Sequence, residues 1–256
     1  MTERDTTAII GGAAAAGPGP GSDLGPGTSP APLAGLVVVF DWNGTIMDDA
    51  ERARAATATV LRRRGRPGLT ADEFAAAFRL PLSEFMHGLG ITPADAAQAE
   101  REWNAHLAAH PAPARPHAAD ALDALRRHGA RLGVLSAASA DPVRTDLVAA
   151  GLADRFDFVE TAVADKPGRL SAHRRGHPLG VYVGDTAYDI RSGHRAGCLA
   201  IGVSGGYQRA GALLTAGADA LVSDLADLPG VIRDLVNRDG LHSPDTSRAE
   251  PSGSPP

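Results

Sequence analysis

Four side chains in this sequence have the chemistry to transfer a phosphoryl group together: two carboxylates, one hydroxyl and one ammonium. They belong to Asp41, Asp185, Ser136 and Lys166. A carboxylate can attack phosphorus and form an acyl phosphate. The group in transit spreads negative charge over its oxygens, so the site must supply positive charge and hydrogen-bond donors. We therefore interpret these residues as a candidate site for phosphoryl transfer, with Asp41 as its nucleophile.

The other three residues have separate predicted roles. Asp185 could hold Mg²⁺ together with Asp41, because Mg²⁺ prefers oxygen ligands, and the ion would reduce the repulsion between carboxylate and phosphate. Lys166 offers a compact positive charge to phosphate oxygens, and it is the only lysine among 25 basic residues. Ser136 and the backbone N–H groups after Asp41 can donate the remaining hydrogen bonds.

Unbroken apolar runs predict the strands that position these residues. Such runs are typical of strands buried on both faces of a parallel sheet. The predicted strands are Leu36–Phe40, Leu132–Leu135, 157–159, Val181–Val183, Leu199–Val203 and 220–222. Helical patterns alternate with them at 117–128, 141–150, 187–197 and 207–216. This alternation predicts an α/β fold with a Rossmann-like parallel sheet flanked by helices.

Ligands bind open parallel sheets beyond the carboxyl ends of the strands. Asp41, Ser136 and Asp185 each stand at such an end, so we expect their side chains at one edge of the sheet. Lys166 is expected in a loop between strands at the same edge. The span from Lys166 to Gly184 is short for a crossover connection, which predicts an abbreviated helix there.

A long helical segment interrupts the alternation of strands and helices. It contains no strand-like run, and prolines separate its four helical patterns. These patterns cover 51–64, 71–77, 82–89 and 93–109. We therefore predict an all-helical cap subdomain (51–112) inserted into an α/β core (35–50 and 113–237). The two ends, 1–34 and 238–256, lack a periodic apolar pattern and are predicted to be disordered tails.

The composition argues against several classes of protein. The chain has 256 residues and a net charge of −5, which disfavours a nucleic-acid-binding protein. No apolar run approaches the roughly 18 residues of a membrane span. The single cysteine, Cys198, cannot form an internal disulfide, which fits a cytoplasmic location. The expected oligomeric state is a monomer or a homodimer.

The motifs resemble those of the haloacid dehalogenase (HAD) superfamily. Asp41-Trp42-Asn43-Gly44-Thr45, followed by Asp48, resembles motif I, Ser136 motif II, Lys166-Pro167 motif III, and the segment from Gly184 to Ile190 motif IV. The resemblance covers roughly residues 36–230, and the helical insertion is similar to that of the phosphoglycolate phosphatase-like branch. It implies a Mg²⁺-dependent phosphatase that acts on a small phosphorylated metabolite through an aspartyl-phosphate intermediate.

The resemblance also implies roles for individual residues. The implied catalytic residues are Asp41, Asn43, Ser136 and Lys166. The implied metal ligands are Asp41, Asp185, Asp189 and the backbone carbonyl of Asn43. The implied substrate contacts are Gly44, Thr45, Ala137 and Arg79. Of these, Arg79 falls where related caps present a specificity loop, and it could bind a substrate carboxylate or a second phosphate.

Asn43 departs from the family pattern, which has a second aspartate at this position as general acid and base. An amide cannot exchange a proton in this way, and such help is typically worth about 10²–10⁴ in rate. Four alternatives follow. The protein hydrolyses an unreactive ester with another group or water as the acid, or it acts on a substrate with a good leaving group. It is a catalytically weak or non-enzymatic phospho-ligand-binding protein, or it belongs to a branch with different chemistry.

Two branches of the superfamily also lack this second aspartate. Phosphonoacetaldehyde hydrolases resemble the motif around Asp41, but they need a cap lysine for a Schiff base, and residues 46–115 contain none. We therefore reject that branch. The 2-haloacid dehalogenases displace halide, which needs no proton, and they use no Mg²⁺. The aspartates of motif IV favour phosphate chemistry, so a dehalogenase is the lesser alternative.

Overall fold

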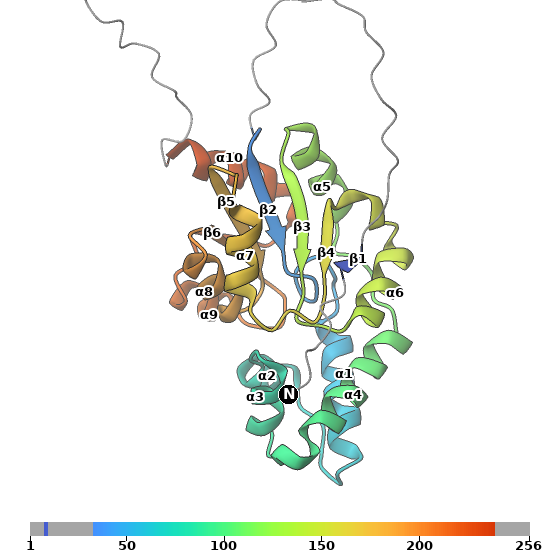
Figure 1. Ribbon diagram of the computed structural model, residues 1–256. Helices are drawn as coiled ribbons and strands as arrows, with labels where there is room; N and C mark the ends of the chain where they lie inside the picture. Colours follow the sequence, from blue (N-terminus) through green and yellow to red (C-terminus); the bar gives the residue numbers. More distant parts are fainter. Residues whose placement is uncertain (1–7, 10–32, 239–256) are drawn as a thin grey trace, which may run out of the picture.

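A sheet with helices on both faces forms the centre of the protein (Figure 1). The computed structural model describes residues 8–9 and 33–238. In this part of the chain the strand order is β1-β4-β3-β2-β5-β6-β7. Strands β2 to β7 run parallel, whereas β1 (Ala8–Ile9) pairs antiparallel with β4. The prediction of an α/β fold with a Rossmann-like parallel sheet is confirmed.

The parallel strands place their side chains in two apolar layers. They are β2 (Leu36–Phe40), β3 (Arg131–Leu135), β4 (Phe158–Glu160), β5 (Leu179–Gly184), β6 (Leu199–Val203) and β7 (Ala220–Val222). Val38 and Phe40 pack in one layer with α5 (Ala118–Arg127), α6 (Ala140–Ala150) and α10 (Leu228–Arg238). Val37 and Val39 pack in the other layer with α7 (Lys166–Arg174). Burial on both faces explains why β2 has no polar alternation.

Two further helices cover the sheet on the α7 side. Ile190 of α8 (Ala187–Arg195) and Leu213 of α9 (Ala210–Thr215) pack on Ala200 of β6. Short 3₁₀ turns lie at Ala153–Arg155 and Leu225–Asp227. Within residues 8–9 and 33–238, no helix has the length and apolar character needed to cross a membrane.

Four helices pack together beyond the carboxyl ends of the strands, in the span predicted as a cap (Figure 1). They are α1 (Ala50–Arg62), α2 (Ala71–Ala77), α3 (Leu82–Gly88) and α4 (Pro93–Ala109). They share an apolar cluster that includes Phe74, Phe78 and Phe85. The ring centroids of these phenylalanines lie 5.1–5.8 Å apart. These four helices therefore form a bundle around an apolar cluster, which Tyr207 from the core also joins.

Two local expectations were wrong. Lys166 is the first residue of α7, not a loop residue, because the Asp165 side chain accepts a hydrogen bond from Gly168 N and starts the helix there. The helix expected from 207 begins at Ala210, because Tyr207 is drawn into the apolar cluster of the cap.

The disorder of the two ends of the chain stays a prediction. Most of the predicted tails, 1–34 and 238–256, lies outside the described residues. Ala8 and Ile9, however, extend the sheet by pairing with Glu160 and Val159, and Arg238 is the last residue of α10. The outer edge of β4 has unpaired backbone N–H and C=O groups. Backbone hydrogen bonds to such an edge do not depend on side chains, so the local sequence pattern did not reveal this pairing.

A buried arginine ties the cap to the core. Both Nη atoms of Arg52, on α1, donate to the carboxylate of Asp146 at 2.7 Å. Its Nη2 also donates to Asp49 at 2.7 Å. Nη1 also lies 3.4 Å from the carbonyl of Leu107, near the end of α4. Burial opposes the ionisation of Arg52, but the carboxylates of Asp146 and Asp49 keep its pKa above the ordinary value. The arginine thus joins both ends of the helical insertion to α6.

Replacing Arg52 with Met is expected to lower the free energy of unfolding by about 3–5 kcal/mol, because two buried carboxylates lose their cation. Urea unfolding followed by circular dichroism measures this change. Arg54→Met is the matched control, since Arg54 lies on the same helix but pairs with the exposed Glu51, and it should change stability little. Equal effects of the two substitutions would contradict a special role for Arg52.

Candidate active site

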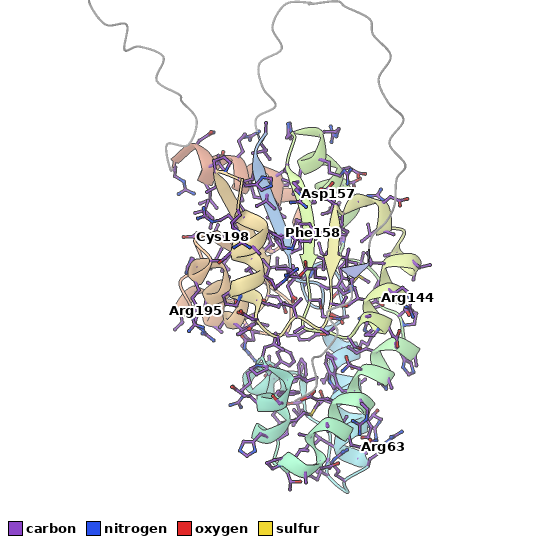
Figure 2. All side chains as sticks on the ribbon, viewed as in Figure 1. Arg63, Arg144, Asp157, Phe158, Arg195 and Cys198 are labelled. Atoms are coloured by element: carbon purple, nitrogen blue, oxygen red, sulfur yellow. The ribbon has the colours of Figure 1, made fainter. Side chains whose placement is uncertain are left out.

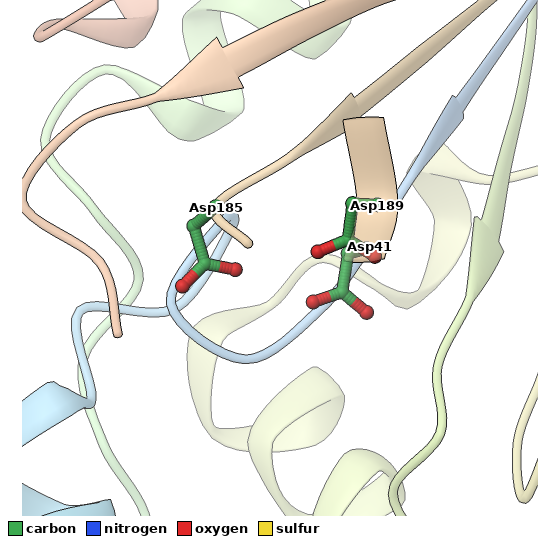
Figure 3. Close-up of side chains that lie close together, drawn as sticks. All are labelled: Asp41, Asp185 and Asp189. Carbon is green, nitrogen blue, oxygen red and sulfur yellow. The ribbon is translucent and has the colours of Figure 1, made fainter. Parts of the chain in front are cut away.

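Three carboxylates gather at the edge of the sheet nearest the cap (Figure 3). Asp41 follows β2, Asp185 follows β5, and Asp189 lies in the first turn of α8. One oxygen of each lies within 4.8 Å of the others, and all three residues are buried. The carboxyl ends of neighbouring parallel strands bring these residues together, as the apolar runs predicted.

Lys166 joins two of these carboxylates. Its Nζ donates to Oδ1 of Asp41 and Oδ1 of Asp189, each at 2.7 Å. Burial opposes its ionisation, but the charges of Asp189 and Asp41 raise the pKa of Lys166 well above its ordinary value. Burial raises the pKa of Asp41 to about 7, with Lys166 opposing this shift and Asp189 adding to it. The single lysine of the chain is therefore a fixed cation beside the predicted nucleophile.

The loops after β2 and β6 hold Asp185 in place. Thr45 Oγ1 donates to Asp185 Oδ1 at 3.0 Å, and Tyr207 N donates to Oδ2 at 2.6 Å. Gly44 has φ of +75°, and a Cβ there would lie 2.1 Å from Asp185 Oδ2. Glycine is therefore required at position 44, because it adopts a positive φ without strain and has no Cβ to collide with Asp185. The sequence at this position is therefore dictated by the approach of the loop to Asp185.

Gly44 and Thr45, which the sequence predicted as substrate contacts, use their donors elsewhere in this arrangement. The N–H of Gly44 donates to Asp49 Oδ1 at 2.7 Å, and the N–H of Thr45 donates to the Trp42 carbonyl. Neither residue lines the cavity at this edge. Their donors are occupied within the turn, so the two residues position the acidic side chains instead.

Asp189 already accepts four hydrogen bonds. Its Oδ1 accepts from Lys166 and from the hydroxyl of Tyr182 at 3.2 Å. Its Oδ2 accepts from the backbone N and the hydroxyl of Thr186, at 3.1 and 2.5 Å. A carboxylate has about four lone-pair positions. Asp189 therefore fits the role of anchor for Lys166 and α8 better than the predicted role of direct metal ligand.

The remaining carboxylates fit a divalent cation with oxygen ligands. Asp185 has a pKa raised well above the ordinary value, first by burial and then by repulsion from Asp41 and Asp189. When all three buried carboxylates are ionised, the single ammonium of Lys166 leaves an excess of negative charge at this edge. A cation of the Mg²⁺ type would offset that excess, because it binds one or two carboxylates through oxygen.

A small cavity lies between this edge and the cap. The core contributes Asp41, Asn43, Ser136, Ala137, Ala138 and Thr186 to its lining. The hydroxyl of Ser136 accepts a hydrogen bond from Ala138 N at 3.1 Å, so its own proton is available to donate. The cavity has a volume of about 40 Å³. Ser136 and Ala137 therefore lie where the sequence predicted, in a space suited to a small substrate.

The cap closes the cavity with apolar side chains. It contributes Phe78, Leu80, Leu82, Trp103 and Asn104. Tyr207, from the loop after β6, lies between cap and core, with its ring centroid 4.7 Å from that of Phe78. The Gln208 amide donates to the Phe78 carbonyl at 2.7 Å and accepts from Ala187 N at the same distance. These contacts dock the cap against the edge that carries the carboxylates.

Arg79 does not join this site, in contrast to its predicted role. Its Nε donates to the nearby Ala77 carbonyl at 3.1 Å, and its guanidinium lies against Gly88. The side chain is exposed and lines a separate groove with Ser83 and His87. Phe78 and Leu80, on either side of it, face the cavity instead. The alternation of the extended segment therefore turns Arg79 outward.

Asn43 lines the cavity, and its amide group is held by Asp49 on the side away from the cavity. Its Nδ2 donates to Asp49 Oδ2 at 2.7 Å. The same oxygen accepts from the hydroxyl of Tyr207 at 2.9 Å and from Arg52. An ionised carboxylate only accepts hydrogen bonds, so the NH₂ group of Asn43 must face Asp49. The amide oxygen is left for the cavity, where it can accept a hydrogen bond but cannot exchange a proton.

Sequence reasoning missed Asp49, Asn104 and Tyr207. Asp49 stands next to motif I, where its residue type alone does not indicate that it binds the side chain of Asn43. Asn104 lies inside a helix without any local signal of function. Tyr207 reaches the cap across the interface between core and cap, which no periodicity in a single segment encodes.

Comparison with known proteins identifies relatives of this chain. A sequence model of the family described as haloacid dehalogenase-like hydrolase matches residues 38–203. The phosphoglycolate phosphatase of Yersinia pseudotuberculosis is 27% identical over 219 residues, covering 75% of this chain and 90% of that protein. The phosphoglycolate phosphatase of Chromobacterium violaceum is 28% identical, covering 75% of this chain and 93% of that protein.

Solved structures share the fold. A hydrolase from Pseudomonas syringae has a TM-score of 0.67 at 20% identity, covering 78% of this chain and 98% of its own. CbbY from Rhodobacter sphaeroides, crystallised with phosphate, has a TM-score of 0.61 at 23% identity, covering 75% and 95%. Cap and core helices are both included in overlaps of this extent, since the shared span exceeds either part alone.

Proposed function

Because the chain belongs to the haloacid dehalogenase-like hydrolase family, we propose that it is a Mg²⁺-dependent phosphatase that hydrolyses a small phosphate monoester on Asp41. The observation that carries this proposal is the Lys166 bridge between Asp41 and Asp189, next to Asp185. A lone carboxylate would repel a phosphate, whereas this one has a fixed cation beside it and lines a cavity. The names of the relatives, phosphoglycolate phosphatases among them, support the same reaction class.

The proposed chemistry has two steps on one carboxylate. An oxygen of Asp41 bonds to phosphorus, and the bond from phosphorus to the alcohol oxygen breaks. Water then attacks the same phosphorus, and the acyl–phosphate bond breaks to release inorganic phosphate and the free carboxylate. The proton that this water loses balances the one that the departing alcohol oxygen takes up from solvent. Lys166 offsets the negative charge of the transferring group, and the Ser136 hydroxyl donates to one of its oxygens.

The proposed metal ligands are Asp41, Asp185 and the backbone carbonyl of Asn43. When bound, Mg²⁺ would supply positive charge to the phosphate oxygens next to the nucleophile. Thr45 and the N–H of Tyr207 hold Asp185 in orientation for this role. Asp189 would act from behind, by holding Lys166.

Turnover of p-nitrophenyl phosphate tests the proposal. Its nitrophenolate leaves without a proton, so the reaction does not depend on an acid at position 43. We expect hydrolysis with Mg²⁺, loss of activity after EDTA treatment, and recovery when Mg²⁺ is restored. Activity that is indifferent to EDTA would contradict the metal assignment. Halide release from a 2-haloacid in the presence of EDTA, without any phosphate release, would favour a dehalogenase instead.

A further inference from the structure

The cap side of the cavity carries almost no polarity. Phe78, Leu80, Leu82 and Trp103 are apolar, and Asn104 is the one polar side chain that the cap contributes within the described residues. The indole N–H of Trp103 is directed away, since it donates to the Thr57 hydroxyl at 3.2 Å. The part of the substrate that meets the cap must therefore pack largely against carbon.

Positive charge is also missing from the lining. Asp41 is the only charged side chain that lines the cavity in the described part of the chain. The nearest cations are already paired: Lys166 with Asp41 and Asp189, and Arg52 with Asp49 and Asp146. Arg115 donates through Nε and Nη2 to the Gly44 carbonyl. No side chain of the lining is left to balance a second anionic group on the substrate.

Three other arginines of the described residues lie on outer surfaces, away from the cavity lining. Arg79 lines a separate groove. Arg63 on the cap and Arg144 on α6, both labelled in Figure 2, have side chains that are 62% exposed. A carboxylate or second phosphate held against the cap would therefore be buried without a counter-ion. Burying an unpaired charge is far more costly than burying a hydroxyl.

On the cap side of the cavity, Asn104 supplies the one directional contact. Its Nδ2 donates to the Glu100 carbonyl at 2.9 Å, within its own helix. Because an amide NH₂ group has two hydrogens, one donor remains. It suits a neutral oxygen, such as a hydroxyl or carbonyl, on a substrate of the size that the cavity admits.

We infer that this enzyme selects phosphate monoesters of small uncharged alcohols and discriminates against those with a carboxylate or a second phosphate. The inference rests on the proposed phosphatase function. The carbon body packs on Phe78, Leu82 and Trp103, and Asn104 binds one neutral oxygen. In this respect the chain differs from what the names of its phosphoglycolate phosphatase relatives suggest.

A matched pair of compounds tests the inference. In 2-hydroxyethyl phosphate a CH₂OH group stands where 2-phosphoglycolate has a carboxylate, so the two differ mainly in charge. As competitors of p-nitrophenyl phosphate with Mg²⁺ present, the neutral compound should have an inhibition constant about 100-fold lower. Equal or tighter competition by 2-phosphoglycolate would overturn the inference, as would no competition by either compound.

Failure of the proposed function is distinguishable from failure of this inference. If p-nitrophenyl phosphate is not hydrolysed, the phosphatase proposal fails on that measurement. Calorimetric binding of the same two compounds to the Asp41→Asn protein with Mg²⁺ then gives the comparison without any turnover. The same preference is expected there, and its absence would overturn the inference.

Two substitutions separate selectivity from general damage. Leu82→Arg puts a cation into the cavity lining, and it should reduce the preference for the neutral compound at least about tenfold. Ser83→Arg adds the same charge one residue along α3, in the separate groove, and should leave the preference unchanged. Equal effects of both, or no effect of Leu82→Arg, would contradict the role given to the apolar lining.

Discussion

Asp41→Asn is expected to reduce phosphate release by about 10⁴-fold or more, because an amide cannot form the acyl phosphate. The substitution changes one oxygen to nitrogen in a residue whose Oδ1 is held by Lys166 at 2.7 Å. The remaining amide oxygen can keep this hydrogen bond. The loss should therefore appear in kcat, with p-nitrophenyl phosphate and with any unactivated ester alike.

Folding should survive this change. Removal of one of three clustered carboxylates relieves repulsion in a buried site, so the thermal unfolding midpoint of the metal-free protein should not fall. Asp141→Asn is the matched control, because it makes the same chemical change on a side chain that is 73% exposed. It should retain full activity.

A second measurement identifies the intermediate directly. Rapid acid quenching of the wild-type enzyme during turnover should leave a phosphoryl group on the peptide that contains Asp41, as seen by mass spectrometry. Full activity in the Asp41→Asn protein would refute the nucleophile assignment, whatever its unfolding midpoint.

The apolar runs were sufficient to predict the meeting of Asp41, Ser136 and Asp185. A strand buried on both faces is recognisable from its own residues, and parallel neighbours must end at the same edge. Lys166 was also predicted to lie there, although its helix begins earlier than expected. The local sequence was thus enough to predict where a site residue lies whenever the strand or helix that carries the residue determines its position.

The misses arise where two distant segments decide the outcome. Gly44 and Thr45 had the residue types for binding phosphate, but Asp49 and Asp185 occupy their donors. Arg79 had the right position along the chain, but the direction of its side chain depends on an extended segment whose neighbours face inward. Tyr207 reads as part of a helix until the cap is docked against it. Sequence periodicity carries no information on such contacts.

Asn43→Asp on its own is expected to restore a proton-transferring group at the cost of stability. The amide of Asn43 lies 2.7 Å from Asp49 Oδ2 in a buried environment. A carboxylate in its place would face a second carboxylate at hydrogen-bond distance, and the two charges would repel. We therefore expect a lower free energy of unfolding in urea for Asn43→Asp than for the wild-type protein at neutral pH.

The double variant Asn43→Asp with Asp49→Ser should remove that conflict. A serine hydroxyl can donate to the new carboxylate and accept from Gly44 N, which now binds Asp49. Arg52 keeps its two hydrogen bonds to Asp146. Because the Tyr207 hydroxyl loses its acceptor at Asp49, the double variant should recover part, but not all, of the stability that the single Asn43→Asp substitution loses.

The leaving group of the substrate decides how the double variant differs from the wild type. For an alkyl phosphate, whose alcohol needs a proton to leave, kcat should rise by about 10²–10⁴-fold. For p-nitrophenyl phosphate, the first step needs no proton, so the new carboxylate can help only in the attack of water, which both esters share, and the gain should be smaller. Asp49→Ser alone is the control: it disturbs the same contacts without adding an acid, and it should not raise kcat for either ester. An unchanged kcat of the double variant on the alkyl phosphate would mean that another group already transfers the proton, and that Asn43 is no handicap to the natural reaction.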